Sequence, residues 1–264
     1  MREKTSASYL SQLFSLENKT AVVIGAGGFL CSEMAKALGQ AGASVAMLDR
    51  DASALEKKAT VVRKTVNRLM TFPIDVTQKS SHEKVLAEIR KQFGTVDILI
   101  NGAGINAPTP FFEIKQAEWD GIIASHVTGT MLACQVFGEE MVKQKEGSII
   151  NMSSQSAGPP LSKAFAYSVA KAGIKNLTQN LAREWAPFHV RVNALRPGFF
   201  PTEWSKENFI TPEREKAILS HTPMGRYGRP DELIGAVLWL ASDASSFVTG
   251  AEIAIDGGFS CMTI

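Results

Sequence analysis

The chain has 264 residues, of which 45% are hydrophobic and 20% are charged, a composition typical of a soluble globular protein. Lys and Arg number 28 and Asp and Glu number 26, so the net charge of +2 gives no field that would attract nucleic acid or an acidic membrane surface. These values disfavour nucleic-acid-binding and membrane-bound classes and leave a small molecule as the expected partner.

The cysteines and the first residues point to the cytoplasm. Cys31, Cys134 and Cys261 are far apart, which suggests neither a disulfide framework nor a zinc site, and no metal is expected. Residues 1–18 lack the apolar core of a signal peptide. No apolar run approaches the ~20 residues that span a bilayer.

Short apolar runs alternate with longer amphipathic stretches along nearly the whole chain. This order predicts a parallel sheet with helices on both faces, because parallel strands need crossover connections. The predicted strands are 21–24, 44–48, 69–72, 96–100, 148–152, 190–195 and 252–255, and the predicted helices are 28–41, 51–65, 78–93, 116–144, 164–186 and 230–242.

Two segments depart from this alternation. Residues 198–222 contain Phe and Pro among charges and are predicted to form a substrate lid, since a long irregular segment in a compact domain is usually functional. Residues 1–18 form an N-terminal extension with no role beyond packing or partner contact. No repeat or linker divides the chain, so residues 1–264 are predicted to form a single α/β domain.

The first strand leads directly into a glycine-rich turn and then a helix. Gly25, Gly27 and Gly28 precede Phe29 and Leu30. Such a turn lets backbone N–H groups and the helix dipole bind a pyrophosphate, which predicts a dinucleotide site. The glycines do not follow the Gly-x-Gly-x-x-Gly pattern, so a plain tight turn is the alternative.

A carboxylate ends the second strand, because Asp49 stands 24 positions after Gly25. It can accept hydrogen bonds from the adenosine ribose and would repel a 2′-phosphate, which predicts NAD. The neighbouring Arg50 leaves NADP open, since a guanidinium pairs with phosphate. A helix-capping acid is the alternative interpretation of Asp49.

Polar and small residues also follow the third and fourth strands. They are expected at the ligand-binding edge because the carboxyl ends of parallel strands meet there, although each could be a turn. These residues are Asp75, Val76, Asn101, Ala103 and Gly104.

Tyr167 and Lys171 lie four apart in a predicted helix, which places them on one face, one turn apart. Ser154 follows the fifth strand and stands 13 residues before Tyr167. The spacing alone is weak evidence, and the nearby serine strengthens it.

With these motifs the chain resembles the short-chain dehydrogenase/reductase family over nearly its full length. The resemblance implies a Rossmann-type doubly wound sheet of about seven parallel strands and a nicotinamide cofactor. It also implies that Ser154 binds the substrate oxygen, that Tyr167 exchanges the proton, and that Lys171 holds the nicotinamide ribose. The residues that would border the nicotinamide are Pro197, Gly198 and Thr202.

Lys171 is expected to lower the pKa of Tyr167. A phenol has a pKa of about 10, so a base near neutral pH needs a shift of about 3 units, or about 4 kcal/mol. One ammonium ~4 Å away at an effective dielectric constant of ~20 supplies about 4 kcal/mol. An oxidised nicotinamide ring would add to this effect.

The chain departs from the family pattern at two places. Ile24, Phe29 and Cys31 stand where the family has Thr and two glycines, and His126 follows Trp119 where the family has Asn. In the family this Asn positions a water that links the lysine to solvent. His126 could hold that water, or titrate near its reference pKa of ~6.5 and join a proton relay. A helix histidine that only fills space is the alternative.

The segments 197–204 and 221–226 resemble the sugar-acid and polyol branch of the family, particularly D-mannonate (fructuronate) oxidoreductases. A sugar acid carries a carboxylate, so a cation should reach it. Arg196 and Lys163 are the candidates, with Gln155 as a further polar substrate residue, and either cation could equally form a surface or subunit salt bridge.

The sequence therefore predicts an NAD-dependent oxidoreductase that interconverts a secondary alcohol and a ketone on a sugar acid or polyol. A reductase of 3-oxoacyl thioesters or another carbonyl is the first alternative. A non-catalytic nicotinamide-binding sensor is the second. The family resemblance also implies a homodimer or homotetramer.

Overall fold

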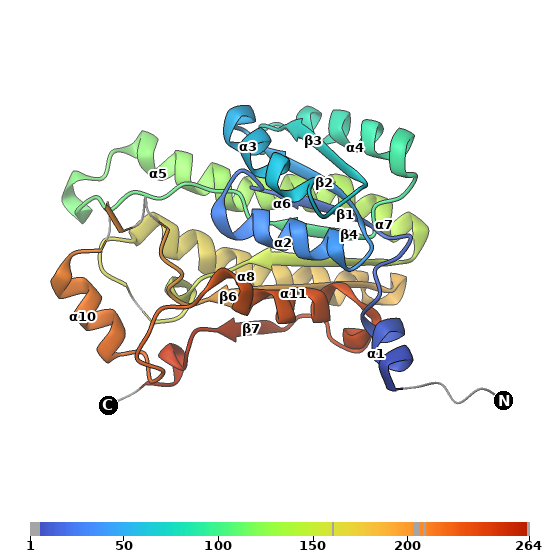
Figure 1. The fold of residues 1–264 in the computed structure, drawn as a ribbon. Coiled ribbons are helices and arrows are strands. Elements are labelled where there is room, and N and C mark those ends of the chain that lie inside the picture. Colours follow the sequence, from blue (N-terminus) through green and yellow to red (C-terminus); the bar gives the residue numbers. More distant parts are fainter. Residues whose placement is uncertain (1–5, 160, 203–205, 208–209, 263–264) are drawn as a thin grey trace.

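The computed structural model describes residues 6–159, 161–202, 206–207 and 210–262. They form one parallel sheet of seven strands in the order β3-β2-β1-β4-β5-β6-β7 (Figure 1). This confirms the doubly wound fold. The strands are β1 Thr20–Ile24, β2 Ser44–Asp49, β3 Leu69–Pro73, β4 Ile98–Asn101, β5 Gly147–Met152, β6 Val190–Pro197 and β7 Glu252–Ile255.

Helices cover both faces of the sheet, and the alternation of side chains in β1 shows how. Ala21 and Val23 are buried in one core cluster with α2 and α11, whereas Val22 and Ile24 are buried in a second cluster with α4 and α8. The helices are α2 Phe29–Gln40, α3 Ala52–Val62, α4 Lys79–Phe93, α8 Phe165–Trp185 and α11 Ile234–Ala241.

The predicted helix 116–144 is interrupted twice. It comprises α5 Gln116–Ile123, α6 Gly129–Ala133 and α7 Glu139–Gln144, joined by π-helical turns at Ala124–Thr128 and Cys134–Gly138. Such turns are frequent at functional sites, and the first contains His126. By length and composition the whole run could cross a membrane, but half of its most apolar stretch is buried, as in the core helix of a soluble protein.

Both segments that depart from the alternation contain a helix. In the extension, α1 Ser6–Phe14 contacts the turn 243–245, and Leu16 is buried in the core. In the segment 198–222, α10 Pro212–Ser220 begins at a proline after the capping residue Thr211. Residues 203–205 and 208–209 of the predicted lid lie outside the described residues.

Candidate active site

A cavity of about 650 Å³ opens at the carboxyl ends of the strands. It lies beside β1 and β4, where the order of the strands reverses and open α/β sheets bind their ligands. Its lining comes from the first turn (Gly25, Gly28–Cys31), from Gly102, 104–106 and His126, from 152–154 and Ser156, from Leu161, Lys163, Ala164, Tyr167 and Lys171, and from 197–202, Ile210, Arg214 and Ile218.

The structure brings most of the predicted residues to this cavity. Those that line it are Gly25, Gly28, Phe29, Leu30, Gly104, His126, Ser154, Lys163, Tyr167, Lys171, Pro197, Gly198 and Thr202. Those that lie elsewhere are Gly27, Asp49, Arg50, Asp75, Val76, Asn101, Ala103, Gln155 and Arg196.

The first turn forms a cradle that suits a pyrophosphate. Helix α2 starts after Gly28 with no side-chain cap and no acidic residue in its first turn, so its N-terminal N–H groups and dipole are available to an anion. A Cβ atom on Gly25 would lie 2.8 Å from the backbone N of Ala103, so this turn requires glycine. The residues present therefore fit the phosphates of a nicotinamide dinucleotide.

Cys31 stands where the family has glycine, and its side chain packs against Gly102. A Cβ atom on Gly102 would lie only 2.2 Å from the Cys31 Sγ, so the thiol fills the space above that glycine. Burial raises the pKa of Cys31 to about 12.

Asp49 also supports the first turn. Its Oδ2 accepts a hydrogen bond of 2.9 Å from the Gly27 N–H, and its Oδ1 accepts one of 3.0 Å from the Asp51 N–H. Each carboxylate oxygen keeps further acceptor capacity for a ribose hydroxyl. Arg50 is exposed, and its charge is among the causes that lower the pKa of Asp75, after the hydrogen bonds from Thr77.

Asn101 points into the core rather than toward a ligand. Its Nδ2 donates to Asn151 Oδ1 at 2.8 Å, and Asn151 Nδ2 donates to Thr178 Oγ1 at 2.9 Å. Thr178 belongs to α8, the helix that carries Tyr167 and Lys171. The side chain of Asn101 therefore joins β4, β5 and α8, and the expectation that it contacts the cofactor is not supported.

Ser154, Tyr167 and Lys171 meet at the cavity, but their electrostatics differ from the expectation. Burial raises the pKa of Tyr167, and a hydrogen bond with Ser154 opposes this rise. Lys171 donates to the Met152 carbonyl at 2.6 Å, and burial lowers its pKa to about 8. The protein's own groups thus do not lower the pKa of Tyr167, because burial outweighs the one opposing hydrogen bond.

His126 is buried and neutral. Its Nε2 must donate to the Ile105 carbonyl at 2.8 Å, which leaves Nδ1 as a buried acceptor with no partner among the described residues. Burial, and then the charge of Lys171, lower the pKa of His126 to about 3. The expectation that it titrates near 6.5 is therefore wrong. A Cβ atom on Gly104 would lie 1.9 Å from the imidazole Cε1, so the ring packs directly on this glycine.

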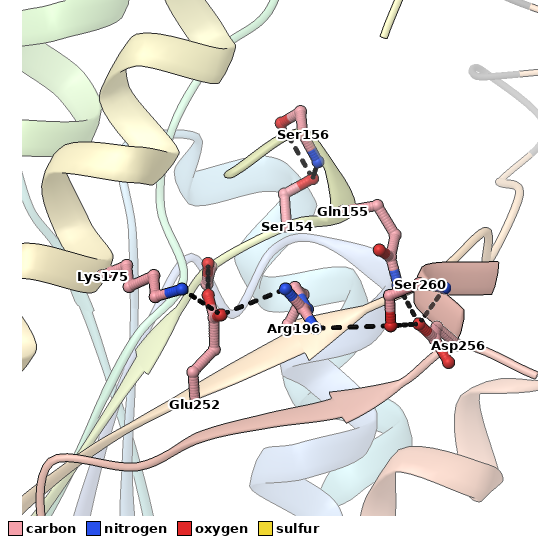
Figure 2. Close-up of polar contacts among 9 residues, drawn as sticks. Ser154, Gln155, Ser156, Lys175, Arg196, Glu252, Asp256 and Ser260 are labelled. Atoms are coloured by element: carbon pink, nitrogen blue, oxygen red, sulfur yellow. Dashed lines mark hydrogen bonds and ion pairs between the residues drawn. The ribbon is translucent and has the colours of Figure 1, made fainter. Parts of the chain in front are cut away.

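Two of the three predicted substrate residues do not line the cavity and instead contact carboxylates (Figure 2). Arg196 forms an ion pair with Glu252, with 3.2 Å between Nη1 and Oε2, and Gln155 Nε2 donates to Asp256 Oδ2 at 2.5 Å. Arg196 thus forms a salt bridge, as in its alternative interpretation, but within the chain and largely buried rather than on the surface. Only Lys163 reaches the cavity.

Arg214 is a lining residue that the sequence interpretation missed. It lies on α10, and among the described residues its guanidinium makes long hydrogen bonds of 3.4 and 3.5 Å to Ser162. Among the described lining residues Lys163, Lys171 and Arg214 are cationic, and none is Asp or Glu. Its position in the predicted lid was the signal that could have identified it.

The chain is similar to known proteins over most of its length. Residues 28–260 match the family model described as enoyl-(acyl carrier protein) reductase. An uncharacterized oxidoreductase of Bacillus subtilis is 39% identical over an alignment of 269 positions that covers 93% of this chain and 96% of that protein. The galactitol 2-dehydrogenase (L-tagatose-forming) of Cereibacter sphaeroides is 37% identical over 249 residues, which cover 94% of this chain and 97% of that protein.

A solved structure is similar over the same range. It is a candidate D-mannonate oxidoreductase of Haemophilus influenzae with bound NAD, with a TM-score of 0.87 and 36% identity over 94% of this chain and 97% of that one. The chain therefore belongs to the short-chain dehydrogenase/reductase family. It is an oxidoreductase that acts on CH–OH groups with a nicotinamide dinucleotide, NAD or NADP.

We expect His126 to make folding sensitive to acid. The unfolded chain binds a proton near pH 6.5 and the folded chain only near pH 3, so stability is present above pH 6.5 and is lost as the pH falls toward 3. From pH 8 to pH 5 this loss is about 2 kcal/mol. Urea unfolding at both pH values should show a smaller loss in His126→Asn.

The exposed His189 provides the matched control. His189→Asn should keep the wild-type difference between the two pH values. Equal differences in wild type and His126→Asn would contradict the assignment of a buried, neutral imidazole.

Proposed function

We propose that this chain is an NAD-dependent oxidoreductase that interconverts a secondary alcohol and a ketone on a sugar acid. The observation that carries the choice of an acid is the position of Lys163 and Arg214 in the cavity lining, without a carboxylate among the described lining residues. The name of the Haemophilus influenzae relative, a candidate D-mannonate oxidoreductase, points to the same substrate class.

The proposed mechanism assigns the substrate oxygen to Ser154 and Tyr167. Their hydroxyl groups would hold this oxygen, and Tyr167 Oη would deliver or remove its proton. Lys171, with a pKa of about 8, is mostly protonated at neutral pH and lies with Nζ 5.4 Å from the centre of the Tyr167 ring. When bound, the nicotinamide exchanges the hydride with the substrate carbon, and its oxidised ring brings a positive charge to the site.

The cofactor would be held by groups from several segments. The N-terminus of α2 would bind the pyrophosphate, and Asp49 the adenosine ribose. Pro197, Gly198 and Thr202 would border the nicotinamide. Asp49 favours NAD, while the exposed Arg50 would be the group that admits NADP.

Neutral polyols are the second candidate substrates, supported by the galactitol 2-dehydrogenase relative. A third candidate function is the reduction of 3-oxoacyl thioesters. It is supported by the apolar lining residues Leu161, Phe199 and Phe200 and by the description of the family model. A sensor without catalysis is disfavoured because Ser154, Tyr167 and Lys171 all line one cavity. We place the enzyme in the cytoplasm, a reducing compartment, which the three free cysteines support. We also propose that it forms a homodimer or homotetramer.

Tyr167→Phe should abolish turnover, because it removes the only group proposed to move the proton. The affinity for NADH, measured by fluorescence titration, should remain near wild type. Ketone reduction is followed by NADH absorbance on a panel of ketose acids, ketoses and a 3-oxoacyl thioester. Turnover by this variant would exclude the assignment.

Arg214→Gln should lower kcat/KM for a ketose acid by about 10- to 100-fold, since a hydrogen bond to a charged group contributes about 1.5–3 kcal/mol. The value for an uncharged ketose of the same length should change less than about threefold. Lys216→Gln is the control, because Lys216 is exposed on the same helix and does not line the cavity. Equal losses for both substrates would argue against carboxylate recognition.

Asp49→Asn should relax cofactor choice. The amide oxygen can still accept the Gly27 N–H, so the turn is retained while the charge that repels a 2′-phosphate is removed. The ratio of the NADPH Kd to the NADH Kd should fall at least about tenfold, a change of about 1.4 kcal/mol. An unchanged ratio would show that Asp49 only supports the turn.

A further inference from the structure

Ser154 lies in a segment with few local restraints of its own. It is the second residue after β5, and its Oγ accepts hydrogen bonds of 3.2 Å from the N–H and the hydroxyl of Ser156. These bonds close a short turn, but they do not connect the serine to α8, which carries Tyr167. A hydrogen bond joins Ser154 to Tyr167 directly, and Lys171 of the same helix donates to the Met152 carbonyl at 2.6 Å. Neighbouring side chains add further restraints on the distance between the two hydroxyl groups.

The residues on either side of Ser154 are both anchored at strand β7. Ser153 Oγ donates to Glu252 Oε1 at 2.7 Å, and Gln155 Nε2 donates to Asp256 Oδ2 at 2.5 Å. Glu252 is the first residue of β7, and Asp256 directly follows the last residue of this strand. Two carboxylates thus hold the segment from the far edge of the sheet.

Arg196 separates these two carboxylates (Figure 2). It pairs in register with Ala254, halfway between Glu252 and Asp256. One end of its guanidinium contacts Glu252 at 3.2 Å, and the other donates at 3.3 Å to Ser260 Oγ, which in turn donates to Asp256. The residue predicted to bind substrate instead forms an ion pair with Glu252 and is linked to Asp256 through Ser260.

Glu252 also reaches the helix that carries the tyrosine. Its Oε2 lies 3.3 Å from Lys175 Nζ, and Tyr167, Lys171 and Lys175 follow one another at intervals of four on one face of α8. The Glu252 side chain is only 9% exposed, so these contacts are shielded from solvent. One carboxylate therefore contacts both Ser153 and α8.

We propose that Glu252 is a positioning residue that holds Ser154 in register with Tyr167. The proposal rests on the catalytic roles proposed above for these two hydroxyl groups. Glu252 does not line the cavity, so it acts through Ser153 and Lys175 and touches neither substrate nor cofactor.

Two variants weaken or remove the contacts between Glu252 and its partners. Glu252→Gln keeps an acceptor but loses the attraction to both cations, and Lys175→Met removes only the contact with α8, at a side chain that is 40% exposed. Each should lower kcat about 10- to 100-fold, because small displacements of reacting groups cost this much. The KM and the Kd for NADH should change less than about threefold. The control is Glu56→Gln on α3, which breaks an exposed ion pair with Arg63 at the end of this helix.

A double-mutant cycle with Ser154→Ala separates positioning from general destabilisation. If Glu252 acts through Ser154, then Glu252→Gln should change kcat less than about twofold once Ser154 is absent. Losses that multiply in the double variant would overturn the proposal.

A second readout does not depend on turnover. In protein labelled with ¹³Cζ-tyrosine, the Tyr167 resonance, assigned with Tyr167→Phe, reports the hydrogen bond from Ser154 that lowers the pKa of this tyrosine. Glu252→Gln should raise this pKa as Ser154→Ala does, with no further rise in the double variant. An unchanged Tyr167 titration in Glu252→Gln would overturn the positioning role. The expected rise in the Tyr167 pKa, combined with no turnover of any substrate on the panel by the wild type, would overturn only the proposed function.

Discussion

A parallel sheet carries every carboxyl end of its strands to the same edge, and the site depends on this constraint. The strand order reverses between β1 and β4, so the turns after these two strands lie against each other instead of being covered by a crossover helix. Gly25 and Gly102 allow their backbones to approach within van der Waals contact. The cavity is therefore a result of topology first and of side chains second.

Helix α8 is the second element that must be fixed, because two of the proposed catalytic residues belong to it. On one side the buried chain from Asn101 through Asn151 to Thr178 joins it to β4 and β5. On the other side Glu252 joins it to β7 through Lys175. Hydrogen bonds away from water are strong and directional, so such networks define one arrangement of helix and sheet. Polar residues that look functional in the sequence here serve to orient others.

The sequence predicted where elements and motifs lie along the chain better than it predicted where individual side chains point. The seven strands and the first turn were predicted from periodicity, which is a local property. Ser154, Tyr167 and Lys171 were singled out by spacing together with the family resemblance, and all three line one cavity. Arg196 was misassigned because its partner Glu252 is 56 residues away, and no local pattern shows on which face of β6 the side chain lies. The state of His126 could not be predicted either, since its low pKa comes from burial and from the charge of Lys171.

Cys31 places a sulfur atom in the wall of the cavity where the family has glycine. Burial raises the pKa of this thiol to about 12, so it stays protonated at neutral pH, and only the thiolate attacks electrophiles or peroxide at an appreciable rate. This replacement therefore adds volume without adding chemical reactivity. A reactive carbonyl compound could pass through the cavity next to this cysteine without alkylating it.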